Sequence, residues 1–204
     1  GVVIIVLIGF GIFQWTEVMN IDESEDPIVI EVYAKQFAWQ ARYAGADNTL
    51  GLGNVNFIDE TNNPIGVDMT DAASLDDKPV SELHLPKGKK VLFKFRSQDV
   101  LHSAYMPHFR AQMNCVPGMV TQFGFTPKYT TEEMRQQSEV MDKTRGINKI
   151  RSEKGEDLYE FDYVLLCNKI CGASHYSMQM KIIVEEEEAY NEWLAEQPTY
   201  AEKL

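Results

Sequence analysis

Apolar residues fill the start of the chain without interruption. Residues 1–13 read GVVIIVLIGFGIF and carry no charge, and a helix of that length would cover about 20 Å at 1.5 Å per residue. A bilayer core is about 30 Å thick, and no polar face breaks the stretch. We therefore expect residues 1–15 to be the C-terminal part of a transmembrane helix that starts before Gly1. A buried soluble helix or strand pair is the alternative.

The residues after this stretch suggest its orientation. Trp15 falls where an aromatic anchor at the membrane interface is expected. The acidic residues Asp22, Glu23, Glu25 and Asp26 follow without any Lys or Arg among them. Because cytoplasmic flanks are usually rich in Lys and Arg, this flank favours the non-cytoplasmic side.

From Pro27 onward, apolar and polar residues alternate with a period of two, which is typical of strands. Five stretches show the pattern: residues 28–33, 81–85, 91–95, 161–166 and 181–184. Residues 86–89 (PKGK) read as a turn, so we expect 81–85 and 91–95 to form antiparallel strands. Residues 44–54 and 59–66, rich in Gly, Asn and Asp, read as loops. Short strands without alternating helices predict a mainly β Greek-key sandwich or barrel over residues 27–184.

Two segments depart from this pattern. Residues 128–157 are charged at 14 of 30 positions, and Thr130 with Glu133 has the spacing of a capping box. We expect a solvated helical insertion there. In residues 185–204, four consecutive Glu precede an amphipathic stretch, which predicts a C-terminal helix with acids at its positive end.

Composition narrows the class of protein. The 204 residues are 44% apolar and 25% charged, with a net charge of −12. This excludes a disordered chain, disfavours binding to nucleic acid, and would attract a basic partner. The acids expected to attract such a partner lie in loops: Asp47, Asp59, Glu60, Asp68, Asp71, Asp76 and Asp77.

The strongest chemical signal is the twelve-residue stretch CNKICGASHYSM, residues 167–178. Cys167, Cys171, His175 and Met178 offer two thiolates, an imidazole and a thioether, a soft set that selects copper over hard cations. Zinc rarely uses methionine. Taken singly, Met178 could be a core residue and the cysteines a disulfide; together on one loop they indicate a copper site.

Such a site needs another imidazole from a distant strand. His102 lies at an inter-strand edge and is the best remaining ligand, whereas His108 follows Pro107 in a loop. Alternation directs His84 away from the side of Leu83 and Leu85, which predicts a surface position. Cys115 is expected to be a small buried residue.

These residues resemble subunit II of the haem-copper cytochrome c oxidases over nearly the whole chain. The matching motifs, in chain order, are the apolar residues 1–13, QFAW at 36–39, DVLHS at 99–103, VPG at 116–118 and C-x-x-x-C-x-x-x-H-x-x-M at 167–178. The resemblance implies a cupredoxin-like domain that carries the dinuclear copper centre called CuA. It implies that Cys167 and Cys171 bridge two coppers, that His102 and His175 each cap one, and that Met178 and the Lys169 carbonyl complete them.

The resemblance also implies a role within a larger enzyme. The chain would accept electrons from cytochrome c, or a cytochrome c domain, and pass them to the haem of subunit I, where oxygen reduction is coupled to proton pumping. Further oxidase subunits would complete the complex. The domain would lie on the periplasmic side of the bacterial inner membrane. Both thiols must lose their protons to bind metal, so copper should also stabilise the fold.

Three departures from the family pattern stand out. Phe37 replaces the tryptophan at which electrons usually arrive, and Arg42 stands where an acid is common, so Phe37 and Trp39 are both candidates for donor docking. No C-x-x-C-H occurs, so the donor haem belongs to another protein. Lys169 replaces a Glu whose carboxylate reaches magnesium at the subunit I interface; an ammonium cannot ligate a cation, which makes that magnesium doubtful.

Other classes of function remain open at this point. A membrane-tethered mononuclear blue-copper carrier would use His102, Cys171, His175 and Met178 and leave Cys167 idle. A quinol-oxidase subunit would lack the copper thiolates. A simple binding domain would join Cys167 and Cys171 in a disulfide.

Overall fold

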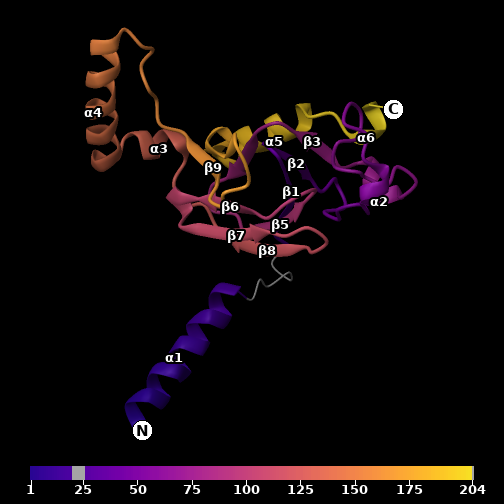
Figure 1. Cartoon of the computed structure of the whole chain (residues 1–204), viewed down its shortest axis with the longest axis horizontal. Helices are drawn as coiled ribbons and strands as arrows, with labels where there is room; N and C mark the ends of the chain where they lie inside the picture. The colour runs from indigo at the N-terminus through magenta and orange to yellow at the C-terminus, as the bar shows by residue number, and fades with distance from the viewer. Residues whose placement is uncertain (20–25, 204) are drawn as a thin grey trace.

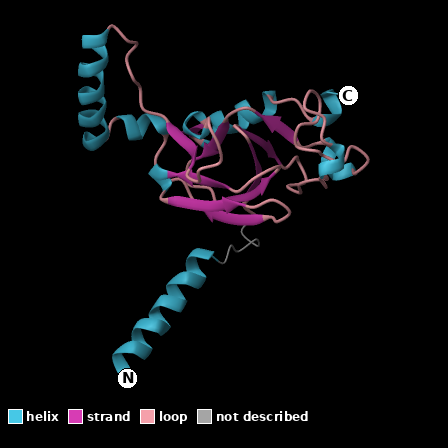
Figure 2. Ribbon diagram, in the orientation of Figure 1, coloured by secondary structure: helices cyan, strands magenta, loops and turns pink. Residues whose placement is uncertain are grey.

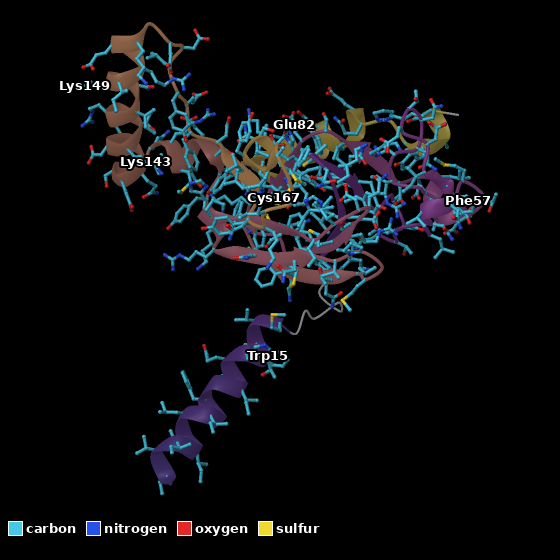
Figure 3. The ribbon with its side chains drawn as sticks, in the orientation of Figure 1. Trp15, Phe57, Glu82, Lys143, Lys149 and Cys167 are labelled. Atoms are coloured by element: carbon cyan, nitrogen blue, oxygen red, sulfur yellow. The ribbon has the colours of Figure 1, made fainter. Side chains whose placement is uncertain are left out.

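An apolar helix precedes the folded domain in the computed structural model, which describes residues 1–19 and 26–203 (Figure 1). Helix α1 (Val2–Met19) has 18 residues and none of them is buried. It is long and apolar enough to cross a membrane, and Trp15 is exposed on it (Figure 3). The predicted acidic positions Asp22, Glu23 and Glu25 lie outside the described residues.

The described strands form two five-stranded sheets. The first contains β1 (Ile28–Lys35), β2 (Ala38–Tyr43), β3 (Lys78–Val80), β5 (Val91–Ser97) and β8 (Thr121–Phe125), in the spatial order β3-β2-β1-β5-β8. The second contains β4 (Leu83–Pro86), β6 (His102–Met106), β7 (Ala111–Cys115), β9 (Tyr163–Cys167) and β10 (Gln179–Glu185), in the order β4-β10-β9-β6-β7. Figure 2 shows these strands as one compact β body with helices around it.

Apolar side chains from both sheets meet in a single core. Ile30, Phe93 and Phe95 of the first sheet and Leu165 and Ile182 of the second are all fully buried in the same cluster. Burying a side chain of this size stabilises the fold by about 1.5–3 kcal/mol. The predicted mainly β sandwich, preceded by an apolar helix that could span a membrane, is confirmed.

One predicted strand pairing is wrong. Strands β4 and β5 do not form a hairpin: β4 pairs parallel with β10, and β5 pairs parallel with β1. The turn between them carries the chain across the sandwich, where the Lys87 N–H donates to the Glu185 carbonyl and the Gly88 N–H to the Pro127 carbonyl, both at 2.8 Å. Alternation reports which face of a strand is buried, and it does not report which strand lies beside it.

The predicted surface position of His84 is also wrong, because the residue is 6% exposed. Helix α5 (Glu187–Glu196) packs against β4 and covers this side of the strand. The His84 ring stacks on Trp193 with ring centroids 3.9 Å apart, and its Nδ1 lies 2.6 Å from Glu185 Oε1. The predicted C-terminal helix is confirmed, and it is this helix that buries His84.

Arg42 lies in a buried ion cluster rather than on a docking surface. Its Nε lies 2.6 Å from Glu31 Oε2, and its Nη1 lies 2.7 Å from Asp77 Oδ2. Its Nη2 donates to the Gly51 carbonyl at 2.7 Å. Because Asp77 is fully buried, it cannot attract a basic partner at the surface, and that part of the acidic-loop prediction is wrong. Short helices α2 (Ala72–Leu75) and α6 (Tyr200–Lys203) lie at this end of the sandwich (Figure 1).

The charged insertion is helical. Helix α3 (Thr131–Arg135) begins with the predicted capping box, in which the Glu133 N–H donates to Thr130 Oγ1 at 3.1 Å and the Thr130 N–H to Glu133 Oε2 at 2.9 Å. Helix α4 (Ser138–Lys154) has no buried residue, and it projects from the sandwich (Figures 1 and 2). Residues 155–161 return beside it to β9. We call residues 138–161 the arm.

Candidate metal centre

Two strand ends bring the first donors together. Strands β6 and β9 run antiparallel, with Ala104 opposite Cys167. The first residue of β6 and the last residue of β9 therefore lie at the same end of the sheet. The Asn168 N–H donates to the Ser103 carbonyl at 3.0 Å and fixes this end. His102 Nδ1 therefore lies 3.7 Å from Cys167 Sγ. Cys167 is buried, and Figure 3 labels it over the middle of the β body.

Residues 168–178, the donor loop, fold back over Cys167. The Cys167 N–H donates to the Met178 carbonyl at 3.1 Å, which closes the loop onto the strand. Within it, a 3₁₀ turn (His175–Ser177) is formed with a bond from the Met178 N–H to the His175 carbonyl at 3.2 Å. This turn brings His175 and Met178 to the same side as Cys171.

The sulfur atoms of the loop and the strand form one cluster. Cys167 Sγ and Cys171 Sγ lie 3.9 Å apart, and both cysteines are free. Cys171 Sγ lies 3.7 Å from His175 Nδ1 and 4.0 Å from Met178 Sδ. The donor atoms of His102, Cys167 and Cys171 all lie within 4.8 Å of one another, and all three residues are buried.

Lys169 reaches this cluster through its backbone alone. Its carbonyl oxygen lies 3.3 Å from Cys167 Sγ, whereas the residue itself is exposed. All six sequence-predicted metal residues are thus gathered at one place: His102, Cys167, Lys169, Cys171, His175 and Met178.

Burial changes the acidity of one thiol in the cluster. Burial, together with the neighbouring Cys167 sulfur, raises the pKa of the Cys171 thiol well above its usual range. At neutral pH this thiol keeps its proton unless a cation stabilises the thiolate. The third cysteine is separate: Cys115 is fully buried in β7, where burial raises the pKa of its thiol to about 12. The predicted burial of Cys115 is confirmed.

The Asp99 carboxylate, to which the sequence assigned no role, bonds the ring nitrogen of His102 that does not face the sulfur atoms. Asp99 Oδ1 lies 2.8 Å from His102 Nε2, so Nδ1 is left to face the sulfur. Burial alone would raise the pKa of Asp99, but hydrogen bonds from the Gln36 N–H at 2.7 Å, from His102 and from the Val100 N–H outweigh burial and lower it. The available signal was the acid three residues before His102.

The two candidate docking aromatics lie at different depths. Trp39 is 6% exposed; its Nε1–H donates to the Met178 carbonyl at 3.4 Å, and its ring meets His102 edge-on at 6.3 Å. Phe37 lies in the turn between β1 and β2 and packs on Gly172 of the donor loop. Beside it, the Gln36 side-chain amide donates to the Cys171 carbonyl.

Apolar side chains adjacent in sequence to the donors are exposed. Ile170 is 90% exposed and Tyr176 87% exposed, both on the donor loop, and Leu101 next to His102 is 47% exposed. Sequence alternation gave no sign of them, because they lie in loops. An exposed apolar group of this kind marks an interaction surface in many proteins.

Comparisons with known proteins agree on one family. The family described as cytochrome c oxidase subunit II, periplasmic domain, matches residues 28–150. An alternative cytochrome c oxidase subunit 2 of Bradyrhizobium diazoefficiens is 34% identical over 203 residues, covering 98% of this chain and 61% of that protein. Cytochrome c oxidase subunit 2 of Thermostichus vulcanus is 26% identical over 112 residues, covering 55% of this chain and 25% of that protein. The chain thus spans less than two thirds of these relatives.

Among solved structures, the periplasmic domain of subunit II of cytochrome oxidase (CoxB) of Bradyrhizobium japonicum aligns with a TM-score of 0.48 and 17% identity. The alignment covers 82% of this chain and 91% of that one. The matched family range ends at residue 150 and so includes His102 but not the donor loop, whose assignment rests on its own geometry.

Proposed function

The chain belongs to the cytochrome c oxidase subunit II family, and on that premise we propose that its donor cluster holds a dinuclear copper centre that receives electrons for the oxidase. One observation carries the proposal. Two free thiols lie 3.9 Å apart, and each has its own imidazole nitrogen at 3.7 Å. A mononuclear blue-copper site would use both imidazoles but only one thiol, so it is the second thiol that favours two metals.

The donor chemistry fits copper. His102, Cys167, Cys171, His175, Met178 and the Lys169 carbonyl would hold the metal. Two thiolates and two imidazoles alone would also suit zinc, and the Met178 thioether favours copper because zinc rarely uses methionine. Calcium, which takes oxygen ligands, does not fit this set. Bound there, the copper pair supplies a one-electron relay.

The surrounding residues keep the donors in place. Asp99 orients His102, the Gln36 amide holds the Cys171 carbonyl, and Trp39 holds the Met178 carbonyl. Because these contacts hold three of the donor residues, the ligand positions would change little between oxidation states. Small reorganisation favours fast electron transfer, which is the property that a relay requires.

The exposed apolar residues and Phe37 indicate where partners meet this chain. We place the electron donor, a cytochrome c or cytochrome c domain, over Phe37, since Trp39 is buried. Acids that remain at the surface, such as Asp47, Asp59 and Glu60, would steer a basic donor. Electrons would then pass to subunit I, which would reduce oxygen and pump protons, with this domain on the periplasmic side of the membrane.

Electron paramagnetic resonance of the copper-loaded full chain in detergent tests the proposal. We expect hyperfine structure shared equally over two copper nuclei, with two coppers bound per chain. Cys167→Ser should convert the signal to that of a single nucleus. Cys115→Ala is the matched control, since this buried thiol lies opposite His102 but is not one of the donors, and it should leave two coppers bound with the shared signal. A single-nucleus spectrum from the unaltered chain would establish the blue-copper alternative instead.

A further inference from the structure

The arm carries a groove that has no part in the donor cluster. One wall is a single face of helix α4, formed by residues at intervals of three and four: Met141, Thr144, Arg145, Asn148, Lys149 and Ser152. The other wall is the return segment, residues 158–161. The groove has a volume of about 950 Å³.

Hydrogen bonds hold the two walls at a fixed separation. The Asn148 amide bonds Tyr159 twice: its Nδ2 donates to the Tyr159 carbonyl at 2.9 Å, and the Tyr159 N–H donates to Asn148 Oδ1 at 2.7 Å. At the two ends of the segment, Arg151 donates to the Asp157 carbonyl and Arg135 Nε to the Phe161 carbonyl at 2.9 Å. The groove is therefore preformed, which lowers the entropic cost of filling it.

The lining combines exposed apolar side chains with positive charge. Met141 is 47% exposed and Leu158 is 68% exposed. Arg135 is balanced by Glu160 and Asp162, and Arg145 lies 3.0 Å from Asp142. Lys149 has no ion partner among residues 1–19 and 26–203.

Lys149 therefore leaves an unmatched positive charge at an apolar groove, within a chain whose net charge is −12. Figure 3 shows Lys149 on the arm, farther from α3 than Lys143.

We propose that this groove docks an acidic amphipathic helix of a partner polypeptide. An apolar face would enter the groove and a carboxylate would pair with Lys149, the helix-in-groove mode of recognition. Residues 141–152 span about 16 Å along α4, which matches about three turns of a partner helix. The proposal does not depend on copper.

Photo-crosslinking in native membranes tests the occupant. A benzoylphenylalanine is introduced in the full-length chain at Met141, inside the groove, or at Ile150, which is 54% exposed on the opposite face of α4. We expect position 141 alone to give one discrete polypeptide adduct. Mass spectrometry should map it to a segment rich in Asp and Glu, with apolar residues every three or four positions. A lipid adduct, a second copy of this chain, a non-acidic segment, equal yields from both positions or no adduct would overturn the proposal.

A pair of charge reversals tests the role of Lys149. Lys149→Glu should reduce the adduct from position 141 at least tenfold. Lys143→Glu makes the same change of charge on the face of α4 that does not line the groove, and should leave the yield unchanged. Circular dichroism of both variants checks that α4 stays helical. Equal yields in the two variants would show that charge does not select the partner, and would overturn the acidic occupant.

Discussion

Strand β9 lies between two segments of the chain that are held in place by different kinds of contact. The arm precedes it and the donor loop follows it. Helix α4 of the arm buries no residue, whereas the donor loop buries Cys171 and Met178 against the sandwich. The arm is ordered by its own helical hydrogen bonds and by the two hydrogen bonds between Asn148 and Tyr159. The loop is ordered by Phe37, Gln36 and Trp39, which come from elsewhere in the chain. We therefore expect the stability of the arm to depend on local helix propensity. The stability of the donor loop should depend on whether an added side chain fits against the residues that pack on the loop.

The largest expected effect is at Gly172 of the donor loop. Its φ is +145°, and an added Cβ would lie 2.8 Å from two ring atoms of Phe37. Gly172→Ala should lower the free energy of unfolding by about 1–3 kcal/mol, because it adds a clash to a strained backbone. Denaturant unfolding of the full chain in detergent measures this cost.

Gly118→Ala is the matched control for that substitution. Gly118 also has a positive φ of +75°, but its Cβ would meet nothing within 4 Å. We expect Gly172→Ala to cost more than Gly118→Ala. Equal costs would show that backbone conformation alone governs the donor loop.

A glycine in the arm should respond in the opposite direction. Gly146 lies inside α4, and an added Cβ would meet nothing within 4 Å. Gly146→Ala should stabilise the helix by about 0.5–1 kcal/mol, since glycine is the costlier residue in a helix interior. Slower amide hydrogen exchange in α4, with exchange in the sandwich strands unchanged, is the measurement.

Gly155→Ala provides the contrast within the same helix. Gly155 ends α4 at a φ of +69°, so a side chain there should speed exchange in the last turn. If Gly146→Ala also speeds exchange, the arm depends on more than local propensity.

The smallest expected effect is the pH dependence at the base of the arm. The ion pair with Lys87, together with the Thr130 N–H, lowers the pKa of Glu133 from its ordinary 4.5. Because the folded pKa lies below the unfolded one, this stabilisation is present above the unfolded pKa and is lost as the pH falls through the folded pKa. The protection factors of the amides in α3, which correct for the pH dependence of intrinsic exchange, should therefore fall on acidification.

Glu133→Gln should flatten that profile in α3. Glu139→Gln, which removes an exposed carboxylate from α4 instead, should leave the profile as it is in the unaltered chain. A profile that persists in Glu133→Gln would place the titrating group elsewhere.

The same contrast explains what the sequence could predict. The capping box of α3 and the helix after Glu185–Glu188 depend on neighbours within one or two turns, so local patterns were sufficient. The pairing of β4 with β10 and the burial of His84 under Trp193 depend on residues that lie about a hundred positions away in the chain. Periodicity contains no information about such partners.

The residues of the donor cluster also differ in whether local sequence was sufficient to predict them. Cys167, Cys171, His175 and Met178 follow from one short motif, since their spacing is local. His102 needed the resemblance to a family as well as its position. Asp99 and Gln36 stood in the quoted motifs but were given no role: Asp99 bonds His102 three residues away, whereas Gln36 bonds Cys171 across the fold, a contact that spacing does not report.

The parallel pairing of β4 with β10 also sets an order for biosynthesis. Leu83 pairs with Ile182, so β4 leaves the ribosome long before its partner strand exists. Contacts of such large sequence separation form slowly, and an unpaired apolar strand is prone to associate with other chains. Because β10 also pairs with β9, which ends in Cys167, the second sheet closes only after residues 179–185 have been synthesised. The donor cluster at the end of β9 therefore assembles after strands β1 to β9 have already left the ribosome.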